Sequence, residues 1–85
     1  MARIIDGDQM NLIGAKLKKI RKQHKLSQKA LSEKLELMGV YICRGSISRI
    51  EDGVRTVTDI ELFALAKILN VSVEELFDEN RISYF

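Results

Sequence analysis

Apolar side chains recur every three or four positions along most of this chain, in runs that are each only a few turns long. The first run predicts a helix over residues 10–23, because Met10, Ile13, Leu17 and Ile20 fall on one helical face. The sequence contains no proline, and its 85 residues suffice for one domain. Short amphipathic helices must therefore share one core, which indicates a compact all-α fold.

Four more helices are predicted from side chains that cap helix starts and from residues that suit helix ends. Ser27 is placed to begin the second helix and Gly39 to end it, while Ser72 and Glu75 form the capping box of a short fifth helix. Gly53 is the expected end of the third helix. The expected spans are 28–38, 44–52, 59–70 and 73–77.

The fourth expected helix is apolar around most of its circumference, because Ile60 and Phe63 broaden a face already formed by leucines. Such a helix is usually packed from several sides. The sequence thus predicts five helices in one domain over residues 10–77. Residues 1–9 would form an arm and residues 78–85 a tail.

Composition excludes several classes of protein. With 46% apolar and 31% charged residues the chain is an ordinary globular sequence, and its longest apolar run is far too short to span a membrane. The first residues lack the apolar run of a signal peptide. The single cysteine, Cys43, cannot form an internal disulfide. These features favour a cytoplasmic protein.

The charge is unevenly distributed, although the net charge is only +2. Residues 12–34 hold eight basic residues and one acid, a net of +7, whereas residues 58–85 hold two bases and six acids, a net of −4. A positive pole of this kind can meet a polyanion. The alternative is that short helices simply carry solvated charge.

The third expected helix combines an apolar face with a cationic one. Ile47 and Ile50 are three residues apart and can face the core. Duplex DNA admits one α-helix into its major groove, where the planar fork of arginine matches guanine. The outward side chains of this helix would be Arg44, Gly45, Ser48 and Arg49.

Four motifs occur in linked order along the chain. They are IGxxLxxIR at 13–21, LSQ at 26–28, SISRIEDG at 46–53 and LAKILNVSVEELF at 65–77. With these motifs the chain resembles the Cro/repressor class of helix-turn-helix regulators, the Xre group. The resemblance covers about residues 12–77 and implies a lambda-repressor-like DNA-binding domain. The turn is longer than usual, which bears on the angle of the third helix.

The resemblance also implies roles for individual residues. Gln28, at the start of the second helix, would grip a DNA phosphate, and Arg55 in the loop after the third helix would touch the DNA backbone. Arg21 and Glu51 would form a structural pair between the first helix and the end of the third. The family positions that meet bases or flanking phosphates correspond to Arg44, Gly45, Ser46 and Arg49.

The resulting expectation is a sequence-specific double-stranded DNA-binding regulator of transcription, a repressor that acts as a homodimer on a near-palindromic operator. A phage or mobile-element repressor, a restriction–modification controller and an antitoxin with a toxin partner all fit. The apolar tail residues Ile82, Tyr84 and Phe85 could serve a partner surface or pack on their own domain. The alternative function is a protein-interaction module that retains the same fold.

No enzymatic, metal or cofactor chemistry is expected. His24 has no second ligand at metal-binding spacing, and Cys43 has no partnered base, so that a modest redox sensitivity is the most it suggests. No glycine-rich phosphate loop and no nucleophile elbow occur in the sequence. We therefore expect a protein that is not an enzyme and needs no cofactor.

Overall fold

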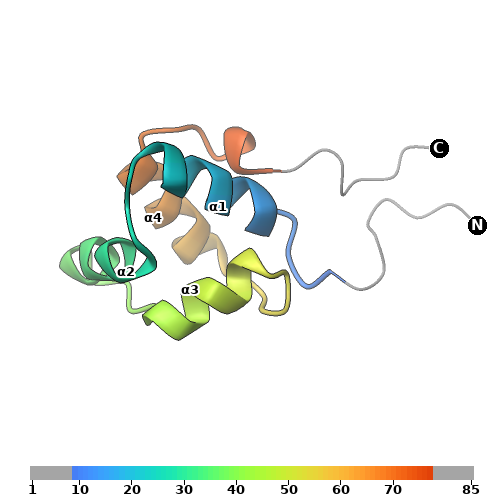
Figure 1. The fold of residues 1–85 in the computed structure, drawn as a ribbon, viewed down its shortest axis with the longest axis horizontal. Helices are drawn as coiled ribbons and strands as arrows, with labels where there is room; N and C mark the ends of the chain where they lie inside the picture. The colour runs from blue at the N-terminus through green and yellow to red at the C-terminus, as the bar shows by residue number, and fades with distance from the viewer. Residues whose placement is uncertain (1–8, 78–85) are drawn as a thin grey trace, which may run out of the picture.

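The computed structural model describes residues 9–77, which fold into four short α-helices and one turn of 3₁₀ helix (Figure 1). The helices are α1 (Gly14–Gln23), α2 (Gln28–Leu37), α3 (Arg44–Glu51) and α4 (Asp59–Leu69), followed by the 3₁₀ turn η1 (Glu74–Leu76). No strand occurs between residues 9 and 77. The all-α prediction is thus confirmed, whereas the predicted arm and tail, including Ile82, Tyr84 and Phe85, fall outside the described residues.

One apolar core joins all of these elements. In Figure 1, α1 lies above α3 while α2 stands at one side, and α2 also packs against α4. The largest fully buried side chains are Leu17, Leu31, Leu35, Ile47, Ile50, Leu65, Leu69 and Leu76. Removing a large aliphatic side chain from water stabilises the fold by about 1.5–3 kcal/mol.

Within residues 9–77 no helix is long and apolar enough to cross a bilayer.

The predicted fifth helix is wrong in length, although its capping box is present. The Ser72 hydroxyl accepts a hydrogen bond from the Glu75 amide at 3.2 Å, and the Glu75 carboxylate accepts one from the Ser72 amide at 2.6 Å. Only a three-residue 3₁₀ turn follows, because the chain is already extended at Phe77. That turn places Leu76 in the core, where it is fully buried.

The predicted start of the first helix is also wrong, because α1 begins at Gly14 and not at Met10. The Asn11 side chain decides this. Its carbonyl oxygen accepts from the amides of Ile13 and Gly14, at 3.0 and 2.8 Å, and so caps the helix from outside. Its amide nitrogen donates to the carbonyl oxygens of Ile50 and Arg55, at 3.0 and 2.8 Å. The chain before α1 therefore crosses the end of α3.

The ends of α2 and α3 follow the prediction. Gly39 has a φ of 79°, in the left-handed region, and the Val40 amide donates to the Leu35 carbonyl at 3.0 Å. This pattern is the Schellman motif, which satisfies carbonyl groups at the end of a helix. Gly53 ends α3 in the same conformation, with a φ of 77°.

Helix α4 is less enclosed than its composition suggested. Ala64, Leu65 and Leu69 are buried as expected. Ile60 is 68% exposed and Phe63 55% exposed, so the expectation that α4 is packed from several sides is wrong. The four short helices of the described chain leave the outer side of α4 uncovered.

Helices α1 and α3 approach each other closely at Gly14. A Cβ atom placed on Gly14 would overlap the backbone carbonyl oxygens of Ile50 and Glu51. Both obstacles are backbone atoms at the end of a helix, which cannot move aside as a flexible side chain can. The crossing of α1 over α3 thus depends on the missing side chain.

We expect Gly14→Ala to lower the free energy of unfolding by about 1–3 kcal/mol, because overpacking forces the two helices apart. Gly45→Ala in α3 is the matched control. A Cβ atom there meets only the Arg49 side chain, at 3.7 Å, so the better helix propensity of alanine should stabilise the fold by up to about 1 kcal/mol. Urea unfolding followed by circular dichroism measures both. Equal effects of the two substitutions would contradict the close crossing.

Candidate nucleic-acid interface

Helix α3 has one face in the core and one face in solvent, as its sequence predicted. Ile47 and Ile50 are completely buried. The first residues of the helix, Arg44 and Gly45, are exposed, and so is Arg49. The serines Ser46 and Ser48 lie half-buried between the two faces. The structure thus brings the predicted recognition residues together on one accessible surface.

Three side chains at the start of α3 are linked by hydrogen bonds. The Ser46 hydroxyl oxygen accepts from the Arg49 guanidinium at 2.9 Å and from the Cys43 thiol at 3.3 Å. Once the thiol is deprotonated, the Ser46 hydroxyl can instead donate to the sulfur, and this hydrogen bond to the thiolate is the main cause that lowers the pKa of Cys43. Arg49 is therefore held along the helix by one of its N–H groups and keeps the others for a ligand. Sequence reasoning placed Ser46 and Arg49 on this surface but missed the bond between them.

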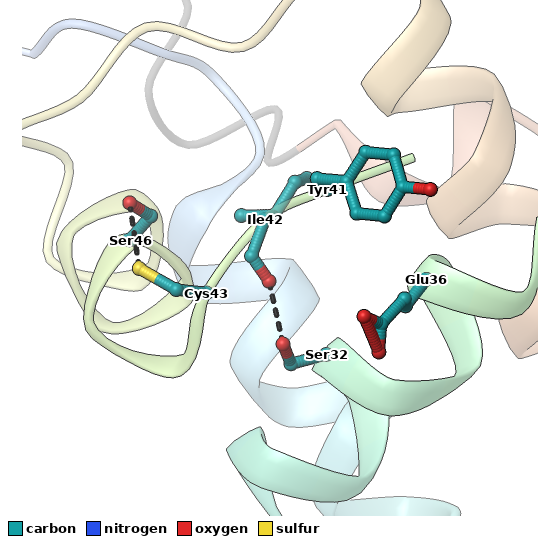
Figure 2. A pocket seen from close by; sticks show the side chains of 6 residues that line it. All are labelled: Ser32, Glu36, Tyr41, Ile42, Cys43 and Ser46. Carbon is teal, nitrogen blue, oxygen red and sulfur yellow. Dashed lines mark hydrogen bonds between the residues drawn. The ribbon is translucent and has the colours of Figure 1, made fainter. Parts of the chain in front are cut away.

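A groove of about 370 Å³ separates the start of α3 from the second half of α2 (Figure 2). On its floor the Ser32 hydroxyl donates to the Ile42 carbonyl oxygen at 2.7 Å. This bond fastens the connection between the two helices, residues 38–43, to α2. The side chains that line the groove are Ser32, Glu36, Tyr41, Ile42, Cys43 and Ser46.

A buried ion pair joins α1 to the end of α3. The Arg21 Nε donates to Glu51 at 2.6 Å, a second guanidinium nitrogen donates to the other carboxylate oxygen at 3.0 Å, and both residues are only 7% exposed. The third guanidinium nitrogen donates to the Leu26 carbonyl at 2.8 Å. The structural role that the family resemblance implied for this pair agrees with this geometry.

Gln28 is connected to the same pair. Its side-chain nitrogen donates to a carboxylate oxygen of Glu51 at 3.0 Å. Gln28 is the first residue of α2, so the ion pair orients the amide at the start of this helix. The predicted phosphate contact of Gln28 remains a prediction, and it would use the second N–H of an amide that is already fixed.

Arg55 is bound within the domain. Its two terminal nitrogens donate to the two carboxylate oxygens of Glu61, at 3.1 and 3.0 Å, and one also donates to the Thr56 carbonyl at 2.9 Å. Glu61 in turn forms a capping box with Thr58 at the start of α4. The predicted backbone contact of Arg55 remains a prediction, and a phosphate would have to use the N–H groups that these bonds leave free.

Sequence reasoning missed the partnership of Arg55 with Glu61. The sequence could have indicated the contact of Glu61 with Thr58, because these two residues have the spacing of a capping box. The contact of Arg55 with Glu61 has no such signature in the local sequence.

Among residues 9–77, no group of three or more His, Cys, Asp or Glu side chains is arranged to hold a metal ion.

The sequence profile of the helix-turn-helix family matches residues 17–76 of this chain. This match spans most of the chain, from within α1 to the end of η1. The chain belongs to the Cro/repressor-type, or Xre-type, helix-turn-helix family. No match was found among curated protein sequences.

Several solved structures are similar to this helix-turn-helix domain. The DNA-binding domain of BldD shares 31% identity, covers 87% of this chain and all of its own, and has a TM-score of 0.68. The restriction–modification controller protein C.AhdI from Aeromonas hydrophila shares 31% identity, with 76% and 91% coverage and a TM-score of 0.64. Hydroxypropylphosphonic acid epoxidase from S. wedmorenis shares 23%, covers 86% of this chain and 36% of its own, and has a TM-score of 0.69. At that identity the epoxidase is similar in fold alone.

We expect Glu51→Gln to lower the free energy of unfolding by about 3–5 kcal/mol, because it leaves the Arg21 charge buried without its partner. Glu36→Gln removes an exposed carboxylate from α2 and should change stability by less than about 0.5 kcal/mol. Chemical unfolding of both variants at neutral pH compares them. A Glu51→Gln variant as stable as the control would show that the pair does not hold α1 and α3 together.

The Arg55–Glu61 pair predicts a dependence of stability on acid. The hydrogen bond from Arg55 is the largest cause that lowers the pKa of Glu61, with a further contribution from Thr58. A carboxylate whose folded pKa is lowered stabilises the fold fully above its unfolded pKa, about 4.3, and loses that contribution as pH falls through the folded value. The stability advantage of the wild type over Glu61→Gln should thus be constant near neutral pH and shrink in acid.

Unfolding by urea at a series of pH values down to about 3 measures this difference. Glu33→Gln, which removes an exposed carboxylate from α2, is the control for the general effect of acid. An advantage over Glu61→Gln that does not change with pH would contradict the pairing.

Proposed function

We propose that this helix-turn-helix protein binds double-stranded DNA in a sequence-specific manner and regulates transcription, with α3 in the major groove. The observation that carries the proposal is the exposed cationic face of α3, anchored by the buried Ile47 and Ile50. A helix fixed from behind presents its outward side chains to base edges without rearrangement.

The comparisons support DNA as the ligand. Two neighbours that each share 31% identity with this chain are described by function, one as a DNA-binding domain and one as a restriction–modification controller. Each aligns over most of both chains. The epoxidase neighbour supports no enzymatic activity here, since it is similar in fold alone, and we propose a protein that is not an enzyme.

The proposed base contacts come from the start of α3. Arg49, held by Ser46, would offer its guanidinium fork to the acceptors of guanine. Arg44 would reach a base or a flanking phosphate from the first residue of the helix. Gly45 has no side chain, and a Cβ atom there would meet only the Arg49 side chain, so the helix could approach the groove closely at this position. Ser48 would contact the groove from the edge of the same surface.

Phosphate contacts would position the protein without specifying sequence. Gln28 would contribute one from the start of α2, where the helix dipole favours an anion, and Arg55 would contribute another from the loop after α3. The connection over residues 38–43, which we take to be longer than the short form of the family, would set the angle at which α3 enters the groove.

The proposed biological role is that of a repressor. One short helix reads only a few base pairs, so we propose a homodimer on a near-palindromic operator with half-sites about one helical turn apart. The setting would be a phage or mobile element, a restriction–modification operon, or a toxin–antitoxin pair in which a toxin is a further partner.

We expect Arg49→Ala to weaken binding to the operator by roughly 5–150-fold, which corresponds to about 1–3 kcal/mol of base discrimination. Binding to random duplex DNA should weaken much less, because only a general electrostatic contribution is lost. The operator would first be obtained by selection from random duplexes, and affinities would be measured by fluorescence anisotropy at one fixed salt concentration.

Lys18→Ala is the matched control, because it removes one exposed positive charge from α1. The Lys18→Ala substitution should weaken binding to the operator and to random DNA slightly and to the same extent. If Arg49→Ala lowers the affinity for the operator and for random DNA equally, the proposal that α3 contacts bases would be contradicted. If no duplex is retained at low salt, the protein-interaction alternative would replace the proposal.

A further inference from the structure

The outer side of α4 carries an exposed stripe of four residues that the core does not use. Asp59, Ile60, Phe63 and Lys67 are all exposed. Asp59 is four residues before Phe63, Ile60 three before it and Lys67 four after it, so the four lie along the same side of the helix. Phe63 lies at the centre, with the Lys67 ammonium 5.4 Å from its ring centroid. Two large apolar side chains therefore stand in water next to one acid and one base.

A shallow groove of about 200 Å³ runs beside this stripe. It lies between α4 and the chain that leads to η1, and Ala66 lines it next to Phe63. Its walls are mainly apolar, as expected for a surface that receives an aliphatic side chain. The lining residues are Phe63, Ala66, Lys67, Val71, Ser72 and Val73.

We propose that this stripe, Asp59, Ile60, Phe63 and Lys67, is the surface that pairs with the same stripe on a second copy of the chain. The two α4 helices would run antiparallel, with a two-fold axis at Phe63. This inference rests on the proposed function to the extent that a homodimer is what brings two α3 helices to one operator.

The order of residues in the stripe is what selects a second copy as the occupant. A two-fold axis places each residue opposite the one at the same distance on the other side of the axis. Asp59 is four residues before Phe63 and Lys67 is four after it. Each Asp59 therefore lies opposite the partner's Lys67, and the pairing of acid with base occurs twice.

The apolar residues obey the same symmetry. Ile60 is three residues before Phe63 and Ala66 is three after it. The axis thus directs each Ile60 to the partner's groove, beside the partner's Ala66. The two Phe63 rings meet at the axis, where an aromatic pair gives a hydrophobic centre, and the charged residues form the rim. None of these residues belongs to α3, and none is among the residues proposed to contact DNA.

The first test is the oligomeric state of the full chain without DNA, measured by sedimentation equilibrium. Phe63→Asp should raise the dimer dissociation constant at least about 30-fold, as expected for an aromatic residue at the centre of an interface. Leu37→Asp, which alters an apolar residue of α2 that is 89% exposed, should leave the constant within about 3-fold. A monomeric wild type, or a dimer unaffected by Phe63→Asp, would overturn the proposal.

The second test uses charge exchange, which leaves the apolar core untouched. Asp59→Lys and Lys67→Asp should each weaken the dimer, because like charges then face each other across the axis, and the double variant should recover most of the loss. A double variant weaker than both single variants would overturn the proposed pairing. Circular dichroism establishes that each variant is folded.

Binding to a DNA half-site separates this inference from the proposed function. The Phe63→Asp monomer should bind a half-site duplex as well as the wild type does at low salt. If Phe63→Asp disrupts the dimer as expected but no duplex is bound by either protein, the proposed dimer surface is supported and the DNA-binding proposal fails. If the Phe63→Asp variant binds a half-site normally but remains dimeric, the DNA-binding proposal is supported and the proposed dimer surface is contradicted.

Discussion

The buried contact between Arg21 and Glu51 connects three of the four helices and fixes the position of α3. The guanidinium extends from α1 to the carboxylate at the last residue of α3, and Gln28 at the start of α2 donates to the same carboxylate. Withdrawing two charges from water costs several kcal/mol for each ion, which only good geometry and further hydrogen bonds offset. Within the described chain no buried side-chain nitrogen or oxygen lacks a partner, so that condition is met.

Other polar contacts position α3 at each of its ends. At its start, Ser32 of α2 binds the Ile42 carbonyl just before the helix. At its end, Asn11 binds the Ile50 carbonyl, and Gly14 lets α1 come close to the same turn. These contacts use backbone carbonyls and the inner side of the helix. The outward side chains are thereby left for a ligand, and their direction is set by the rest of the domain.

The helices themselves followed largely from local sequence. The inward direction of Ile47 and Ile50 could be predicted from their spacing, and the end of α2 from Gly39. The errors arose where distant groups decide the outcome. The first helix starts late because Asn11 is bound to carbonyls about forty residues away. The candidate site was predicted as a surface, but not the internal partners of its polar residues.

By itself the sequence determined an all-helical domain, its helix-turn-helix family and a cationic outer face on α3. Helical periodicity and helix caps depend on residues a few positions apart, so a single chain reveals them. Only the tertiary structure decided that Arg55 is bound to Glu61, that Gln28 is fixed by Glu51, and that the apolar residues on the outside of α4 remain uncovered. These outcomes depend on which surfaces the packing of four short helices brings together. The spacing of residues a few positions apart does not predict such contacts.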